Sequence, residues 1–308
     1  MSIKKILLLP HINIHNANAL SSPFTIGFPA MTAWLGATHA LQRKLKEKGV
    51  QIHCKATGVV SHQFDLQTYR GKNAFVSSII GTANPLDQFG KRPSFIEEPR
   101  CHLNVSLLIE IEGVIQEQHH ILEQTISDIL HAKLKIAGGD IRTFSPPTII
   151  VIDEHNAAEL RAFKRKLMPG YVLIERRDLM IAAMDKGQDP IDAIIDYLAI
   201  HHYCNLNDSN DVIWTRQRKK QNNKPAGWIV PIATGFHGLT DIGLALNQRD
   251  PSTPHRFVES LVTLGEFKMP HRFSNLTQML WHYQFDAENQ LYQCIQTHTT
   301  NIQQDDFI

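Results

Sequence analysis

The chain has 308 residues, of which 43% are hydrophobic and 20% charged, a composition that supports a sizeable core and excludes a disordered protein. Its 31 basic and 30 acidic residues nearly cancel, so a nucleic acid can be bound only through local basic patches. No apolar run approaches the roughly 18 residues of a membrane helix, and the apolar start is too short for a signal sequence. We expect a soluble, cytoplasmic protein without a membrane partner.

Six elements are predicted in the first half of the chain. Their order is strand, helix, strand, strand, helix, strand, at residues 5–14, 31–48, 50–65, 102–112, 117–135 and 140–144. The third strand has the clearest alternation, and Pro10 predicts a bulge or an edge position in the first strand. Gly49 is suited to end the first helix. This order predicts an α+β protein with a ferredoxin-like (RRM-like) βαββαβ core.

Residues 66–101 form a long insertion between the second and third strands, rich in basic residues and turn formers. Insertions of this length are usually functional or disordered. Pro146-Pro147 marks a break, which divides the chain into a core at 1–147 and a mixed α/β C-terminal half at 148–308. In the second half we predict helices at 154–166, 189–204 and 273–284, and strands at 171–175 and 228–233.

Metal and cofactor chemistry finds little support in the sequence. The 17 histidines form no HExxH pattern, and no P-loop or GxSxG motif occurs, so we expect no metal and no cofactor. The cysteines are too far apart for a CxxC knuckle or a disulfide framework, and we expect reduced thiols at Cys54, Cys101, Cys204 and Cys294.

The loop at 16–29 and the glycine pair Gly138-Gly139 are candidate RNA contacts. The loop offers small amide and hydroxyl groups, at Asn16, Asn18, Ser21 and Ser22, beside the start of a helix. The glycine pair would allow close approach of an RNA backbone. The alternatives are an ordinary connection with capping residues and a simple tight turn.

Basic clusters are the second kind of candidate, because phosphate binding needs clustered Arg and Lys. One group lies in the insertion, at Arg70, Lys72, Arg92 and Arg100, and another follows Trp214, at Arg216, Arg218 and Lys224. Each cluster by itself could equally be a solvated surface.

Seven segments carry a resemblance to one family. They are NANALSSPFTIGFPAMTAWLGATHALQRKL (16–45), NPLDQFG (84–90), FIEEPRCHLNVSLLI (95–109), KIAGGDI (135–141), LMPGYVLIERR (167–177), KPAGWIVPIATGFHGL (224–239) and RFVESLVTLGEFKMPHRFSNLTQMLWHY (256–283). In number, order and spacing they resemble the second Csy subunit of type I-F CRISPR complexes, a Cas5-type RAMP protein. The resemblance covers nearly the whole chain.

The resemblance implies a ferredoxin-like RAMP core with a thumb-like insertion and no catalytic residues. It implies a subunit that holds the 5′ handle of the CRISPR RNA together with the large Csy subunit. A backbone Csy subunit would lie next to it, and the whole complex would recognise foreign double-stranded DNA. Within the matched segments or directly beside them, basic and polar chemistry adds four candidate RNA contacts: His39, Arg142, Arg256 and Arg272.

Two other functions remain open from the sequence. Related RAMP folds cleave RNA with a histidine near the first helix, and His15 and His39 lie near that position, so a metal-independent endoribonuclease is one alternative. The other is a structural adaptor that docks a partner through its C-terminal aromatic segment, whose large side chains could be core or interface: Phe267, Phe273, Leu280, Trp281 and Tyr283.

Overall fold

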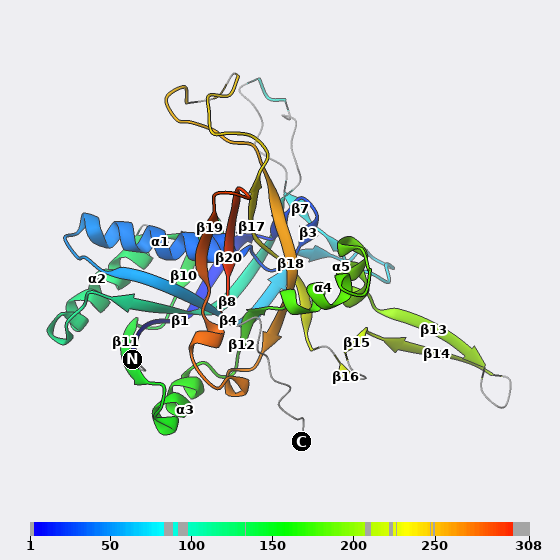
Figure 1. Ribbon diagram of the computed structural model, residues 1–308, viewed down its shortest axis with the longest axis horizontal. Helices are drawn as coiled ribbons and strands as arrows, with labels where there is room; N and C mark the ends of the chain where they lie inside the picture. Colours follow the sequence, from blue (N-terminus) through cyan, green and yellow to red (C-terminus); the bar gives the residue numbers. More distant parts are fainter. Residues whose placement is uncertain are drawn as a thin grey trace.

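One large antiparallel sheet organises the molecule (Figure 1). The computed structural model describes residues 3–82, 89–91, 98–132, 134–206, 211–221, 224–225, 227–246, 248 and 250–297. The main strands are β1 (Ile3–Asn18), β4 (His53–Leu66), β8 (Glu98–Glu112), β9 (Lys135–Ile136), β10 (Gly139–Thr143), β12 (Tyr171–Glu175), β17 (Ile229–Gly238), β18 (Val258–Lys268), β19 (His282–Asp286) and β20 (Leu291–Ile295). They lie in the order β19-β20-β17-β18-β12-β4-β8-β1-β10-β9.

The remaining elements are the helices and the short or peripheral strands. The helices are α1 (Met31–Glu47), α2 (His119–Ala132), α3 (Ala157–Lys166), α4 (Arg177–Met184) and α5 (Pro190–Leu198), with 3-10 turns η1 (Gln116–Gln118), η2 (Pro270–Arg272) and η3 (Thr277–Met279). The other strands are β2 (Leu20–Ser22), β3 (Thr25–Ile26), β5 (Thr68–Tyr69), β6 (Ser78–Ile79), β7 (Gly81–Thr82), β11 (Thr148–Asp153), β13 (His201–Leu206), β14 (Val212–Gln217), β15 (Lys220–Gln221) and β16 (Lys224–Pro225).

The six elements predicted in the first half are confirmed, as β1, α1, β4, β8, α2 and β10. Strand β1 is longer than predicted because bulges keep it in register with β8, and one bulge falls between Leu9 and Ile12, at Pro10. Gly49 has φ +80° after the end of α1, which is the left-handed conformation expected of a helix-terminating glycine. The core strands lie in the order β4-β8-β1-β10.

The two faces of these strands bury different cores. On the first face, Leu103 and Val105 of β8 pack in the cluster that holds Trp34 and Leu41 of α1. On the second face, Leu108 of β8 packs with residues of α3 and of the segment 273–280. The alternation of β8 therefore serves two cores, because successive side chains of a strand point to opposite faces.

The second half departs from the prediction in two places. The helix predicted at 189–204 ends at Leu198, and residues 201–206 form β13, which pairs with β14 in a hairpin that projects from the molecule (Figure 1). The helix predicted at 273–284 is wrong: the segment contains η3 and then β19. Its apolar spacing resembles a helix, but Trp281 forms a β-bridge with Thr57 and donates its indole N–H to the Leu173 carbonyl, 2.9 Å away.

The C-terminal aromatic segment is mainly core. Phe273, Leu280 and Trp281 are buried, whereas Tyr283 is 39% exposed. Strands of the second half also join the first, since β11 pairs with β1 and β12 pairs with β4. The division at residue 147 stays a prediction. Among the described helices, none is long and apolar enough to cross a membrane.

We expect Trp281→Ala to lower the free energy of unfolding by about 3–5 kcal/mol, because it removes a fully buried indole that closes the sheet between β4 and β12. The matched control is Trp214→Ala, whose side chain is 65% exposed and whose loss should change stability by less than about 0.5 kcal/mol. Denaturant unfolding of both variants measures the difference. Equal effects would contradict the assignment of Trp281 to the core.

Candidate nucleic-acid interface

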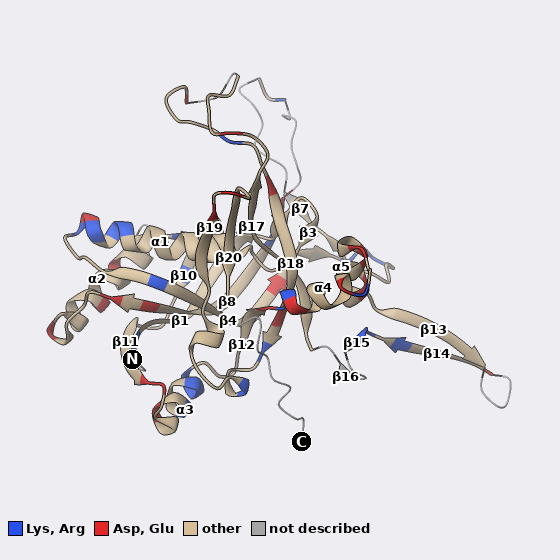
Figure 2. Cartoon of the chain, viewed as in Figure 1, with Lys and Arg blue, Asp and Glu red and all other residues tan. Residues whose placement is uncertain are grey.

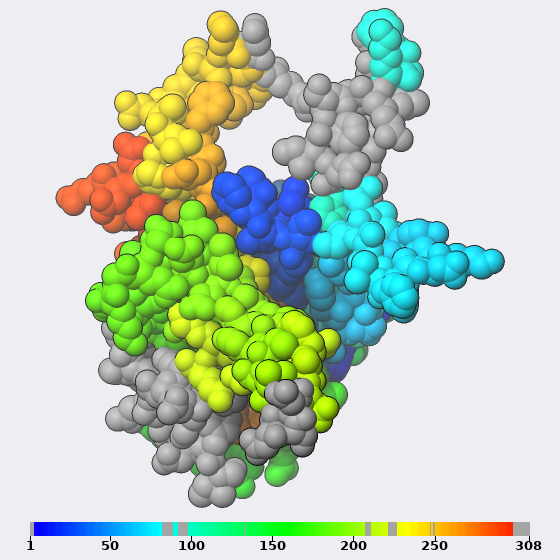
Figure 3. Space-filling view, turned by 90° about the vertical axis from the view of Figure 1, so that its right-hand side faces the viewer, coloured from blue at the N-terminus to red at the C-terminus, as the bar shows by residue number. Residues whose placement is uncertain are grey.

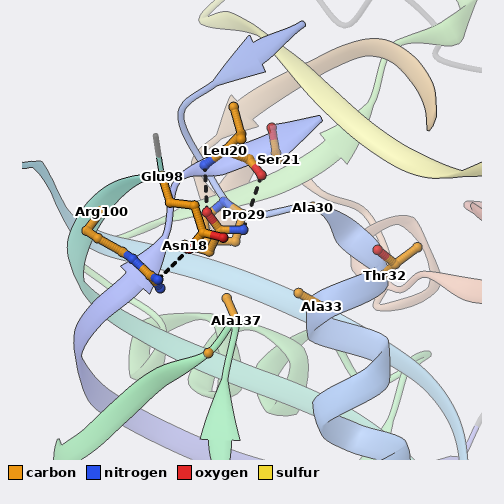
Figure 4. A pocket seen from close by; sticks show the side chains of 11 residues that line it. Asn18, Leu20, Ser21, Pro29, Ala30, Thr32, Ala33, Glu98, Arg100 and Ala137 are labelled. Carbon is orange, nitrogen blue, oxygen red and sulfur yellow. Dashed lines mark hydrogen bonds and ion pairs between the residues drawn. The ribbon is translucent and has the colours of Figure 1, made fainter. Parts of the chain in front are cut away.

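A cavity of about 480 Å³ lies where β1 ends, at the meeting point of four segments (Figure 4). The segments are the β1–β2 connection, the start of α1, the start of β8 and the turn between β9 and β10. The lining residues are Asn18, Leu20, Ser21, Pro29, Ala30, Thr32, Ala33, Glu98, Arg100, Ala137 and Gly138. Segments more than a hundred residues apart in the chain thus form one site.

Backbone hydrogen bonds hold the end of β1 against the other walls. The Asn18 N–H donates to the Ala137 carbonyl at 2.8 Å, and the Ala19 N–H donates to the Pro99 carbonyl at 2.9 Å. The Asn18 amide spans Leu20, accepting from its N–H at 2.9 Å and donating to its carbonyl at 3.2 Å. This side chain is therefore fixed in place before any ligand arrives.

The glycine pair shapes the opposite wall. Ala137 (φ +50°) and Gly138 (φ +73°) form the two-residue turn between β9 and β10, and two positive φ angles are typical of a type I′ hairpin. Gly139 has a different constraint, because a Cβ there would come within 2.9 Å of the Ala17 backbone. Gly138 is needed for its backbone conformation and Gly139 for close packing.

The charge in the cavity is local and mixed. Arg100 pairs with Glu98 at 2.5 Å, so part of its charge is neutralised. Helix α1 starts at the cavity without a capping side chain and without an acidic residue in its first turn. The N–H groups at a helix start carry partial positive charge, and with a guanidinium they suit an anionic group such as a phosphate.

The structure brings several predicted residues to this site. Asn18, Ser21, Arg100 and Gly138 line the cavity, and Gly139 supports it from behind. Asn16 belongs to β1 and not to a loop, because a bulge with Asn16 at φ +66° lets the strand continue. Its amide oxygen accepts from Gln67 at 2.7 Å, beside the cavity.

Ser22 differs from the other loop residues. It is buried, and its hydroxyl contacts the Thr25 hydroxyl at 2.7 Å and accepts from the Phe24 N–H. These contacts make Ser22 a structural residue of the β2–β3 turn, and a direct RNA contact by Ser22 stays a prediction. The segment itself reaches the surface, between the cyan chain near β5 and the yellow chain that follows β17 (Figure 3).

The other predicted contacts are spread over the molecule and do not line the cavity. Basic residues lie apart along the chain, for instance on α3 and β14 (Figure 2). The dispersed candidates are Arg70 and Lys72 in the β5–β6 connection, Arg142 on β10, Arg216 on β14, Arg218 just after it, Arg256 before β18, Arg272 in η2 and His39 on the exposed side of α1. Arg92 and the side chain of Lys224 lie outside the described residues.

The sequence pointed to the start of this helix as a favourable dipole beside the loop, but it did not single out the wall residues of its first turn. Thr32 and Ala33 line the cavity together with Ala30. This first turn has no carboxylate and no capping side chain, so no side chain of its own opposes the partial positive charge of the helix start.

Comparison with known proteins assigns the family. The family described as CRISPR-associated protein (Cas_Csy2) matches residues 7–294. The chain belongs to the Csy2 family. The CRISPR-associated protein Csy2 of Pseudomonas aeruginosa (strain UCBPP-PA14) is 33% identical over 310 residues, which cover 93% of this chain and 94% of that protein. The cavity, which spans residues 18–138, lies within the region that matches the Csy2 family, and this family places the chain in a type I-F CRISPR system.

We expect the two glycines to respond differently to substitution. Gly138→Asn should be tolerated, because Asn adopts positive φ more readily than other residues and nothing but Arg100 lies within 4 Å of the new Cβ. Gly139→Ala should lower the free energy of unfolding by about 1–3 kcal/mol, because its Cβ meets backbone that cannot yield. Thermal or denaturant unfolding compares them, and a fully stable Gly139→Ala would contradict the close packing.

Proposed function

We propose that this chain is a non-catalytic subunit of a type I-F CRISPR surveillance complex and that it holds the 5′ handle of the CRISPR RNA at the cavity beside α1. The observation that carries the proposal is the convergence of Asn18, Ser21, Arg100 and the glycine turn around one cavity. Three separately predicted RNA-binding features meet there. Csy2 family membership supplies the context of the complex.

We further propose that the core is ferredoxin-like and of the RAMP type, with the chain between β4 and β8 as its thumb-like insertion. The order β1-α1-β4-β8-α2-β10 and the sheet order β4-β8-β1-β10 support this. In that fold the first helix follows the first strand directly, so its start lies at the end of β1. The cavity is a consequence of this connection.

The binding mode follows from the chemistry of the walls. A phosphate fits the start of α1 and the Arg100 guanidinium, while base edges fit the fixed amide of Asn18 and the hydroxyl of Ser21. Phosphate contacts supply affinity and base contacts supply selectivity. Because the whole chain has a net charge of only +1, affinity should depend on these few groups and on partner subunits.

The proposed partners are the large Csy subunit, which shares the handle, and an adjacent backbone Csy subunit. The target double-stranded DNA would be reached through the assembled complex in the cytoplasm. The projecting β13–β14 hairpin supports a partner role, since an isolated two-stranded hairpin is marginally stable in water and this one exposes Leu206, Val212 and Trp214.

We expect Arg100→Ala to weaken handle RNA binding and to lower the salt slope of log Kd by about one unit, because one phosphate contact is lost. The matched control is Arg161→Ala, which removes an exposed arginine of α3 that does not line the cavity. Fluorescence titration at several salt concentrations measures both. An unchanged slope for Arg100→Ala would exclude this arginine as a phosphate ligand.

The competing endoribonuclease function requires a histidine base with a partner for the leaving oxygen. His15 stacks on His102 on the second face of the sheet, whereas His39 lies on α1, which covers the first face. His15 and His39 therefore cannot act together on one phosphodiester, and neither of them lines the cavity, which supports the non-catalytic proposal.

We therefore expect repeat RNA to remain intact after incubation with the purified chain in EDTA, where metal-independent cleavage would proceed. Gel electrophoresis of labelled RNA measures the products. A cleavage product that disappears in His15→Ala or His39→Ala would establish the enzyme and overturn the non-catalytic proposal.

A further inference from the structure

The second face of the core sheet changes character along β8. Near Leu108 it is apolar and covered by α3. Toward the cavity its side chains become polar, at His102, Asn104 and Ser106 of β8, His11, Asn13 and His15 of β1, and His62, Gln63 and Asp65 of β4. We call these nine residues the polar face.

Side chains of the polar face are ordered in rows across the strands. Asn13, Asn104 and Gln63 are direct cross-strand partners on β1, β8 and β4 and form a row of three amides. On each side of this row lies a pair of imidazoles with ring centroids 4.3 Å apart, His11 with His62 and His15 with His102. Flat rings and amides therefore alternate along the strands.

The polar face runs directly into the cavity. Arg100 precedes His102 and Asn104 on the same side of β8, and six residues of a strand extend about 20 Å. Gln67 joins the two regions, because its N–H donates to the Arg100 carbonyl at 2.9 Å and its amide donates to Asn16. The Asn16 N–H in turn donates to His102 at 3.2 Å.

One buried atom of the polar face has no hydrogen-bond partner among the described residues. The side-chain oxygen of Asn104 is buried, and no donor from the described part of the chain reaches it. A buried acceptor without a hydrogen bond is costly and rare in proteins, so the described part of the chain does not by itself satisfy the polar groups of this amide row.

We infer that the polar face binds the bases of about two or three unpaired RNA nucleotides next to those held in the cavity, with imidazole stacking and amide hydrogen bonds. The inference rests on the proposed RNA-binding function. A protein partner fits less well, because interface cores are enriched in Tyr, Trp, Met and Arg, and none of the nine residues is of these types. A phosphate backbone also fits less well, because the nine residues include no Lys or Arg.

The test compares two probes on the full-length chain: a single-stranded 12-nucleotide oligoadenylate and an abasic ribose-phosphate chain of equal length. His15 is the residue to change, because it is exposed and its ring contact is with His102, so the fold does not depend on it. His15→Ala should weaken oligoadenylate binding about 5-fold or more and leave abasic binding and the salt slope unchanged. His15→Phe should restore most of the affinity, because the flat ring returns.

The matched control is His120→Ala, which removes an exposed histidine of α2 and should change neither probe. Two results would overturn the polar face as a base-binding surface. The first is an oligoadenylate affinity that is the same for the unmodified chain and His15→Ala. The second is a His15→Ala variant that loses as much affinity for the abasic probe as for oligoadenylate. If Arg100→Ala still weakened binding of both probes in that case, the proposed function at the cavity would stand without the polar face. An unmodified chain that binds neither probe would overturn both.

Discussion

The close approach of the β9–β10 turn to the end of β1 is the contact on which the site depends. Gly139 lies against the Ala17 backbone with no room for a Cβ, and the Asn18 N–H donates to Ala137 at 2.8 Å. Because the turn and the strand end meet here, the start of α1 and the start of β8 face the same cavity. A bulkier residue at 139 would separate these walls.

The two faces of the core strands differ in what they pack against. The first face buries apolar side chains against α1, and this packing sets where the start of α1 meets the cavity. The second face is apolar only where α3 covers it, and it becomes polar toward the cavity. One alternating strand, β8, contributes to both, with Leu103 and Val105 on one side and His102 and Asn104 on the other.

The nearly neutral chain explains why the site is built from backbone groups, amides and a few charges. With 31 basic and 30 acidic residues, there is no general attraction for a polyanion, and Arg100 is itself paired with Glu98. Under the proposed function, local geometry would then supply the selectivity, through the fixed amide of Asn18 and the uncapped helix start. Such a site would favour one segment of RNA over nonspecific binding along any strand.

The amino-acid sequence is enough to predict the local elements of the core, because the alternation of β8, the amphipathic spacing of α1 and the stop at Gly49 are properties of neighbouring residues. It also pointed to Asn18, Ser21 and Arg100 by side-chain chemistry, and to Gly138 because a glycine allows close approach of a backbone. The folded chain was needed to show that these four residues share one cavity, that the Ser22 hydroxyl bonds within its own turn, and that residues 273–284 are not a helix. Those outcomes depend on contacts between distant segments, such as Trp281 with Leu173, which no local pattern encodes.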